Sequence, residues 1–342
     1  MTELNLNVNK SSKQYNYCLD FIKGLACIFV VFMHCEFPGK TGIIVQAISR
    51  FCVPLFFMVS GYFSYSIDNQ WFVTVGARKK IIHIGKIVVY ASLFYLVWLI
   101  CQIVFYGGNQ ISITPYNVSA FLILNLPIGI SSHLWFLFAL LYVYIFYLIL
   151  CRAHITKMTY PLAVCLFVVY FSLAQGAWLI GIDVPNCVYR NWLIEGFPFF
   201  MAGMWIREHK DRISFSNSLL ITIVIVSSVL CLIERLIMGR DFGVNFCTLP
   251  QVFALFLYAV KNPERHSGFV QRIGRDCSLL VYILHMFVWE ILAKIYCEIG
   301  VDSNIIARYI LPILVVIVSI VLALIFNWIV SKFKKEPQIV KP

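Results

Sequence analysis

Charged residues are scarce in this chain. Only 13% of its 342 residues are Asp, Glu, Lys or Arg, whereas soluble domains carry about a quarter, and 61% are hydrophobic. The apolar residues form blocks of roughly 20 residues, the length that crosses the ~30 Å hydrocarbon core of a bilayer as a helix. Short stretches of alternating polarity, which would indicate a membrane barrel, are missing. The sequence therefore predicts an all-α, polytopic transmembrane helix bundle, because backbone groups in lipid must pair within their own segment.

Several signatures of binding and catalysis are also missing. The chain has no HExxH motif, no Walker loop and no GxSxG elbow, so nothing indicates metal catalysis, nucleotide hydrolysis or hydrolase chemistry. Its 12 cysteines show no CxxC pairing and lie mostly in apolar blocks, which is typical of small buried hydrophobes. No aromatic-basic module accompanies the net charge of +11. We therefore expect neither a metal nor a nucleic-acid partner.

We predict about ten membrane spans in one transmembrane domain, residues 19–331, between an N-terminal tail, 1–18, and a C-terminal tail, 332–342. The first apolar block is expected to be retained, because no small-residue cleavage site follows it. The sixth and eighth spans are short for a full crossing, and the uncharged stretch 107–132 is expected to dip partly into the membrane. The predicted spans are 19–36, 43–65, 84–106, 133–150, 159–180, 191–206, 217–238, 247–260, 277–298 and 306–331.

The distribution of basic residues predicts the orientation. With the N-terminus inside, 20 of the 27 Lys and Arg residues fall on inner segments and inner helix ends. Basic residues concentrate on the cytoplasmic side of membrane proteins. Both tails are therefore predicted to be cytoplasmic, with an even number of spans and location in a cell membrane.

Ionisable residues inside the bilayer are costly, so each is a candidate for function. Asp20, Lys23 and His34 lie on one face of the first span by helical spacing, with Asp20 and His34 ~21 Å apart along the axis. Asp20 and Lys23 form an expected i,i+3 ion pair at the cytoplasmic end, which is either structural or part of a site. His34 lies near the opposite side, where it is interpreted as functional rather than as a simple interfacial hydrogen-bonder.

The second span combines an arginine with a proline. Pro54 lacks a backbone donor and is expected to kink the helix about one turn after Arg50, which would shape a polar pocket. Further along, Ser60 and Gly61 fit either that pocket or close packing between helices.

The basic run Arg78, Lys79 and Lys80 has two interpretations. It is typical of a cytoplasmic loop that contacts anionic lipid. It also fits a site for phosphate groups, such as those of coenzyme A, because Arg and Lys are the usual phosphate partners in proteins.

Further polar residues lie within the later spans. His133 and Trp135 open the fourth span, Glu195 lies in the sixth, and Tyr282 and His285 lie in the ninth. Because Glu195 and His285 need polar partners in the membrane, both are candidates for a pocket, although His285 is equally interpreted as a satisfied interhelical hydrogen-bonder.

Together these blocks resemble acyltransferase family 3, a family of integral membrane proteins, in the order that the family shows and over residues 20 to 285. The chain departs from the family at Lys23, where arginine is usual, so it keeps the charge but loses the planar fork of the guanidinium. The pattern is most similar to the branch of about ten helices without an extra esterase-like domain, among the O-acetyltransferases of bacterial surface polysaccharides such as the enterobacterial common antigen enzyme. The matching pieces are Asp20–Lys23–Gly24–Ala26 with His34, Val53–Tyr62, the basic group at Arg78, His133–Leu137, Gly196–Phe200 with Gly203, and Tyr282 with His285.

The resemblance implies an O-acyltransferase of the cell inner membrane that moves an acyl group, usually acetyl, from cytoplasmic acyl-CoA to a hydroxyl of an envelope or exported glycan. It implies His34 as general base, with a covalent acyl-histidine as the alternative. Asp20 would organise the cytoplasmic mouth, and Arg50 would stabilise the oxyanion or hold the acceptor. Cofactor binding falls to Lys23, Arg78, Lys79 and Lys80. The substrate-pocket candidates are His133, Trp135, Glu195, Ser60, Tyr282 and His285.

Two other functions stay open. Embedded charges in a ten-helix bundle also suit an exporter of polysaccharide or glycolipid, and a third interpretation is an assembly partner without acyl transfer. Expected partners are membrane lipid and a glycan or lipid-linked oligosaccharide acceptor, and homo-oligomerisation is left open. The sequence decides neither the acceptor nor the size of the acyl group.

Overall fold

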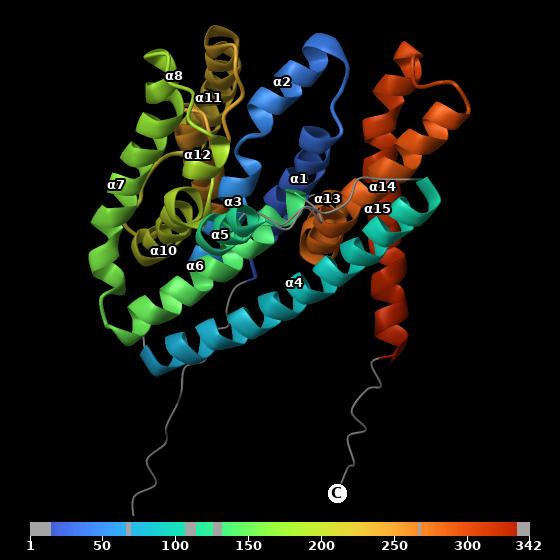
Figure 1. Cartoon of the computed structure of the whole chain (residues 1–342). Coiled ribbons are helices and arrows are strands. Elements are labelled where there is room, and N and C mark those ends of the chain that lie inside the picture. The colour runs from blue at the N-terminus through green and yellow to red at the C-terminus, as the bar shows by residue number, and fades with distance from the viewer. Residues whose placement is uncertain (1–14, 66–69, 107–113, 126–131, 266–267, 334–342) are drawn as a thin grey trace, which may run out of the picture.

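The computed structural model describes residues 15–65, 70–106, 114–125, 132–265 and 268–333, all of them in helices or their connections (Figure 1). Short 3₁₀ and π-helical turns join or interrupt the α-helices. The 3₁₀ turns are η1 (Ser132–Leu134) and η2 (Thr156–Thr159), and the π-helical turns are η3 (Ser172–Gly176), η4 (Trp192–Gly196) and η5 (Ile273–Cys277). The α-helices are α1 (Tyr17–His34), α2 (Gly39–Ser49), α3 (Cys52–Tyr62), α4 (Gln70–Tyr106), α5 (Pro115–Leu124), α6 (Trp135–Arg152), α7 (Tyr160–Phe171), α8 (Ala177–Leu179), α9 (Asn186–Tyr189), α10 (Phe197–His209), α11 (Asn217–Met238), α12 (Thr248–Lys261), α13 (Gly268–Arg272), α14 (Ser278–Glu298) and α15 (Ile305–Phe333).

The long helices make this a multi-pass membrane protein. Within the described residues, eight helical segments are long and apolar enough to cross a bilayer. They correspond to the predicted spans other than 191–206 and 247–260. Those two are the shorter elements, η4 with α10 and the 14-residue α12. Figure 1 shows α7 and α15 upright, whereas α4 runs diagonally across the bundle beside α6.

The second predicted span is broken where the sequence indicated a kink. Helix α2 ends at Ser49 and α3 begins at Cys52, so Arg50 and Phe51 lie between them. A proline ring clashes with the carbonyl of the residue four positions earlier, which for Pro54 is Arg50. The break therefore follows from Pro54, and it places Arg50 at a junction where its side chain leaves the regular helix surface.

Helix α1 lies at the centre of the bundle. Its residues Leu19, Ile22 and Val30 belong to the larger apolar core, which α3, α4, α6, α7, α10 and α12 complete. Its residues Cys27 and Val31 belong to a second core with η5, α14 and α15. Helix α1 thus contacts helices from both halves of the chain.

Helices α3 and α10 cross at two glycines. A Cβ on Gly61 would lie 2.7 Å from the carbonyl carbon of Phe200, and a Cβ on Gly203 would lie 2.7 Å from that of Met58. Ordinary contacts begin near 3.4 Å. The backbones therefore approach as closely as only small residues allow, which is a common way of joining helices in membranes. This contact explains Gly61 as a packing residue.

The described part of the stretch 107–132 ends inside the protein. Helix α5 is capped by Thr114 before its first residue and by Asn125 after its last. Asn125 adopts the left-handed conformation with φ 53°. The buried Asn125 amide donates to the carbonyl of Trp135 over 3.2 Å and accepts from the backbone N–H of Trp192 over 2.7 Å. Asn125 thus fixes the start of α6 against η4, and residues 126–131 lie outside the described part.

Candidate active site

Three histidines from distant parts of the sequence meet beside α1. His34 is the last residue of α1, His133 lies in η1, and His285 lies in α14. The ring centroids are 5.1 Å apart for His34 and His285, 5.0 Å for His133 and His285, and 6.3 Å for His34 and His133. The sequence predicted each of these residues as a site candidate, and the fold brings them into one cluster.

Tyrosines hold two of the histidines in place. The Tyr282 hydroxyl donates to the backbone carbonyl of His133, and the Nε2 of His133 lies 3.3 Å from the carbonyl oxygen of Ile283. Tyr95 from α4 donates to the same Ile283 oxygen over 2.6 Å and accepts from the N–H of Phe287 over 3.3 Å. The Tyr95 hydroxyl therefore bridges two backbone groups of α14, the Ile283 carbonyl and the Phe287 N–H, in the helical turn that carries His285.

The hydrogen bond of His285 defines its tautomer. Its Nδ1 lies 3.2 Å from the carbonyl oxygen of Val281, and a carbonyl can only accept, so Nδ1 donates. In the neutral ring Nε2 then carries a lone pair. This Nε2 is buried and has no hydrogen-bond partner among the described residues. His285 consequently offers an unused acceptor within a ring-to-ring contact of His34.

His34 is the histidine of the cluster that also faces a pocket. The pocket holds about 340 Å³. It lies where α1 ends and α15 begins, and α14 forms its remaining wall. Whereas His133 and His285 are fully buried, His34 is only half-buried. A small molecule in the pocket would thus meet His34 first. The lining residues are His34, Cys35, Glu36, Trp289, Arg308 and Leu311.

Two arginines lie close to the histidine cluster. Arg50 forms an ion pair with Asp241, and the guanidinium of Arg190 stacks over the Trp135 ring at 4.7 Å. Both arginines are near enough to His34 to act on it electrostatically. The site therefore combines imidazoles with fixed positive charge, an arrangement suited to stabilising a developing oxyanion.

Glu195 adds a carboxylate to this positive region. It is 1% exposed, and its Oε2 has no hydrogen-bond partner among the described residues. Arg190 and Arg50 both act on it electrostatically. Glu195 belongs to the π-helical turn η4, which Asn191 caps by accepting from the N–H groups of Leu193 and Ile194. Such turns are frequent at functional sites, where they redirect a side chain.

The candidates at the beginning of α1 form a separate group. Lys23 donates to Asp20 over 2.9 Å, which confirms the predicted pair, and Tyr15 donates to the other carboxylate oxygen. Burial and this hydrogen bond raise the pKa of the Tyr15 hydroxyl to about 12. Because 14 residues of helix span ~21 Å, Asp20 lies far from His34 along the axis. Asp20 and Lys23 thus fix the beginning of α1.

Ser60 does not join the histidines in the structure. Its hydroxyl donates to the carbonyl of Phe56 over 2.9 Å within α3, and its own carbonyl accepts from Tyr144 of α6 over 3.3 Å. These contacts place Ser60 in the packing between α3 and α6.

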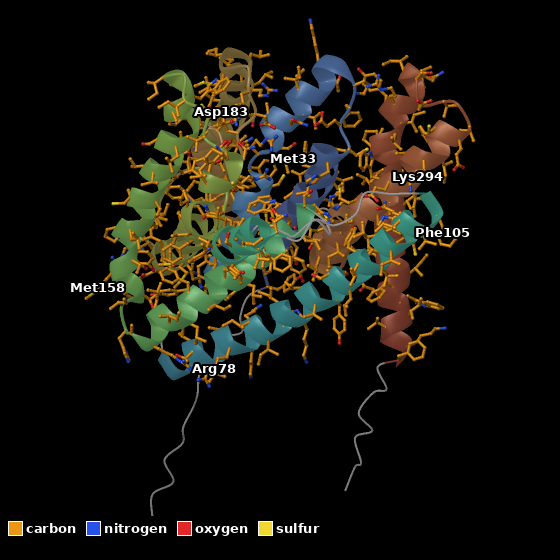
Figure 2. All side chains as sticks on the ribbon, in the orientation of Figure 1. Met33, Arg78, Phe105, Met158, Asp183 and Lys294 are labelled. Atoms are coloured by element: carbon orange, nitrogen blue, oxygen red, sulfur yellow. The ribbon has the colours of Figure 1, made fainter. Side chains whose placement is uncertain are left out.

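The basic group Arg78, Lys79 and Lys80 lies on α4, and all three residues are exposed. Figure 2 shows Arg78 at the lower end of α4, whereas Met33, the neighbour of His34, lies well above it. The basic group and the histidine cluster are therefore on different levels of the bundle.

Several residues of the site were missed by sequence reasoning. Arg190 and Arg308 are two of the seven basic residues outside the predicted inner segments, and a basic residue on the poorer side is itself a signal. Tyr95, Asp241 and Trp289 carry no such signal. Among the described residues, no three His, Cys, Asp or Glu side chains are arranged to hold a metal ion.

A comparison with protein families gives a match over nearly the whole chain. Residues 16–332 match a family described as an acyltransferase domain, acyltransferase family 3. A curated relative, an amino-acid racemase from Enterococcus faecalis, is 25% identical over 337 aligned residues, which cover 89% of this chain. The match covers only 45% of that relative, so the chain spans less than half its length. No solved structure matches.

Proposed function

Because the chain belongs to acyltransferase family 3, we propose that it is a membrane-bound O-acyltransferase that moves an acyl group, most simply acetyl, from acyl-CoA to a hydroxyl of an envelope or exported glycan. The E. faecalis relative is more than twice as long as the region matched to this chain. Racemisation is therefore not part of the proposal.

The observation that carries the proposal is the position of His34. It touches both the other two histidines and the pocket, so a hydroxyl in the pocket would meet an imidazole at once. Neutral imidazole is a suitable general base near neutral pH. The Nε2 lone pair of His285 can accept a hydrogen bond from the His34 ring and so orient it.

The proposed reaction is a direct acyl transfer. His34 takes the proton of the acceptor hydroxyl while the hydroxyl oxygen attacks the thioester carbonyl carbon. The carbon–sulfur bond then breaks, coenzyme A leaves as a thiolate, and the imidazolium returns the proton to that sulfur. Arg50 and Arg190 lower the energy of the negative charge on the carbonyl oxygen. The alternative is an acyl-histidine intermediate: the His34 nitrogen attacks the thioester carbonyl carbon and coenzyme A leaves as a thiolate. The acceptor oxygen then attacks the acyl carbon, the carbon–nitrogen bond to His34 breaks, and the hydroxyl proton passes to the released imidazole.

The proposed donor site lies on the side of α4 that carries Arg78, Lys79 and Lys80. Their exposed side chains suit the phosphates of coenzyme A, as charge-assisted partners. The same residues support an inner-membrane orientation with this level in the cytoplasm and both tails on that side. Acyl-CoA would enter from there, and its acyl end would reach upward to His34.

The test is transfer of labelled acetyl from acetyl-CoA supplied to the cytoplasmic face of membrane vesicles. Loss of a general base typically lowers the rate by about 10²–10⁴-fold, so His34→Ala should retain at most about 1% of the transfer. His209→Ala is the matched control, because His209 lies at the end of α10, outside both the cluster and the proposed donor site, and it should transfer normally. Full transfer by a well-expressed His34→Ala protein would refute the proposal.

The same assay separates the enzyme from an exporter. Neutralising Arg78, Lys79 and Lys80 together should abolish acyl transfer, since a phosphate site is needed only for the donor. An exporter would keep moving glycan across the membrane in that variant, and wild-type vesicles would show no dependence on acetyl-CoA.

A further inference from the structure

The pocket beside His34 has a distinctive chemical lining. Its wall combines the indole of Trp289 from α14 with one acidic and one basic side chain, Glu36 after α1 and Arg308 in the first turn of α15. A volume of about 340 Å³ lies at the small end of the range of ~300–1,000 Å³ that is usual for small-molecule sites. The pocket can therefore admit a terminal part of a glycan but not a long stretch of it.

Arg308 is not held in an ion pair, although Glu36 lines the same pocket. Both Arg308 and Glu36 are exposed, and neither forms an ion pair with any residue in the described part of the chain. By contrast, Arg50 pairs with Asp241 and Arg240 pairs with Asp183. A cation in the first turn of a helix also opposes the partial positive charge of the helix N-terminus. Both positive contributions favour an anion on the α15 side of the pocket, whereas Glu36 disfavours an anion on its own side.

We infer that the pocket binds an acidic acceptor sugar, with Arg308 holding its carboxylate or phosphate group. The ring packs against Trp289, because sugars present apolar C–H faces that suit an aromatic surface. Glu36 accepts hydrogen bonds from ring hydroxyls, which are donors. This inference rests on the proposed function in taking the pocket as the acceptor side of the reaction. It adds that acceptor choice depends on an acidic group near the hydroxyl that His34 deprotonates.

Two simple glycosides test this recognition without any acyl donor. Hexyl β-D-glucuronide and hexyl β-D-glucoside differ only in a carboxylate in place of a hydroxymethyl group. Their binding to the purified full-length chain is measured by isothermal titration calorimetry. A hydrogen-bonded charge pair is worth about 1.5–3 kcal/mol, and 1.4 kcal/mol is tenfold in affinity. Wild type should therefore bind the glucuronide about tenfold more tightly or better.

Arg308→Gln should weaken glucuronide binding about tenfold and change glucoside binding less than twofold. Trp289→Leu should weaken both glycosides alike. Lys40→Gln is the matched control, since Lys40 is an exposed cation at the start of α2 that does not line the pocket, and it should change neither affinity.

The inference is overturned if wild type binds both glycosides equally, if the glucuronide shows no saturable binding, or if Arg308→Gln leaves the preference intact. Because no donor is present, these outcomes do not depend on acyl transfer. A protein that prefers the glucuronide through Arg308 but never transfers acetyl would refute the proposed enzyme and leave the acidic-ligand site standing. A protein that transfers acetyl without this preference would do the reverse.

Discussion

Gly61→Ala is expected to disturb both the stability and the site of this protein. The new methyl group would lie 2.7 Å from the carbonyl carbon of Phe200, where ordinary contact begins near 3.4 Å. Helices α3 and α10 must then separate by more than about 0.7 Å, since the carbonyl oxygen of Phe200 lies closer still and backbone cannot rotate away. Overpacking of this kind costs about 1–3 kcal/mol, which corresponds to a fall in melting temperature of roughly 1–4 °C for a chain of 342 residues. Because α10 continues from the turn that carries Glu195, acetyl transfer should fall as well.

The measurement is the melting temperature of the purified protein in detergent, with transfer assayed on the same samples. Gly76→Ala is the matched control, because Gly76 is also helical and no atom lies within 4 Å of its added Cβ. Alanine is favoured over glycine within helices by about 1 kcal/mol, so Gly76→Ala should melt at or slightly above the wild-type temperature. If both variants melt together at the wild-type temperature, the close crossing of α3 and α10 is not a constraint on this fold.

Two further predictions concern residues that position the site. Tyr95→Phe removes the hydroxyl between Ile283 and Phe287, so these two residues of α14 can bond to each other directly and the helix can shift. We expect a stability loss of about 1 kcal/mol and at least a tenfold lower kcat, with little change in KM for acetyl-CoA. An unchanged kcat would contradict this role. Asp241→Asn leaves Arg50 without its counter-charge. Because the Asp241 side chain is 27% exposed, we expect the free energy of unfolding to fall by about 1–2 kcal/mol, less than the about 3–5 kcal/mol lost when a fully buried pair is broken. Urea unfolding of this variant, of Arg50→Gln and of the double variant measures the coupling, and simple additivity would show that the pair does not stabilise the protein.

What the sequence predicted well depended on local spacing. Asp20 and Lys23, three residues apart in one helix, form the expected ion pair, and Pro54 breaks its span at Arg50. Apolar block length located all eight long helical segments, since a bilayer imposes that length on each segment separately. The interpretation of His34 as functional agrees with its place in the histidine cluster, although its catalytic role stays a prediction.

What could not be predicted are contacts between segments far apart in sequence. His34 and His285 are separated by 251 positions, and no periodicity within either helix encodes that their rings meet. The partners Asp241 and Tyr95 are missed for the same reason, because a single charge after an apolar block and a single tyrosine within one both look ordinary. Ser60 differs from these residues, because its hydroxyl donates within its own helix, and its role in a substrate pocket stays a prediction.

The central place of α1 has a consequence for how the protein is made. Helix α1 enters the membrane before the helices of its second core, η5, α14 and α15, have been synthesised. His34 therefore waits in the bilayer without His285 until nearly the whole chain has been translated. Contacts so distant in sequence form late, so the nascent protein should be unable to use acyl-CoA before its last helices insert. Premature release of the chain would leave a membrane-inserted fragment without α14 and α15. Such a fragment would lack the pocket beside His34 and should be inactive.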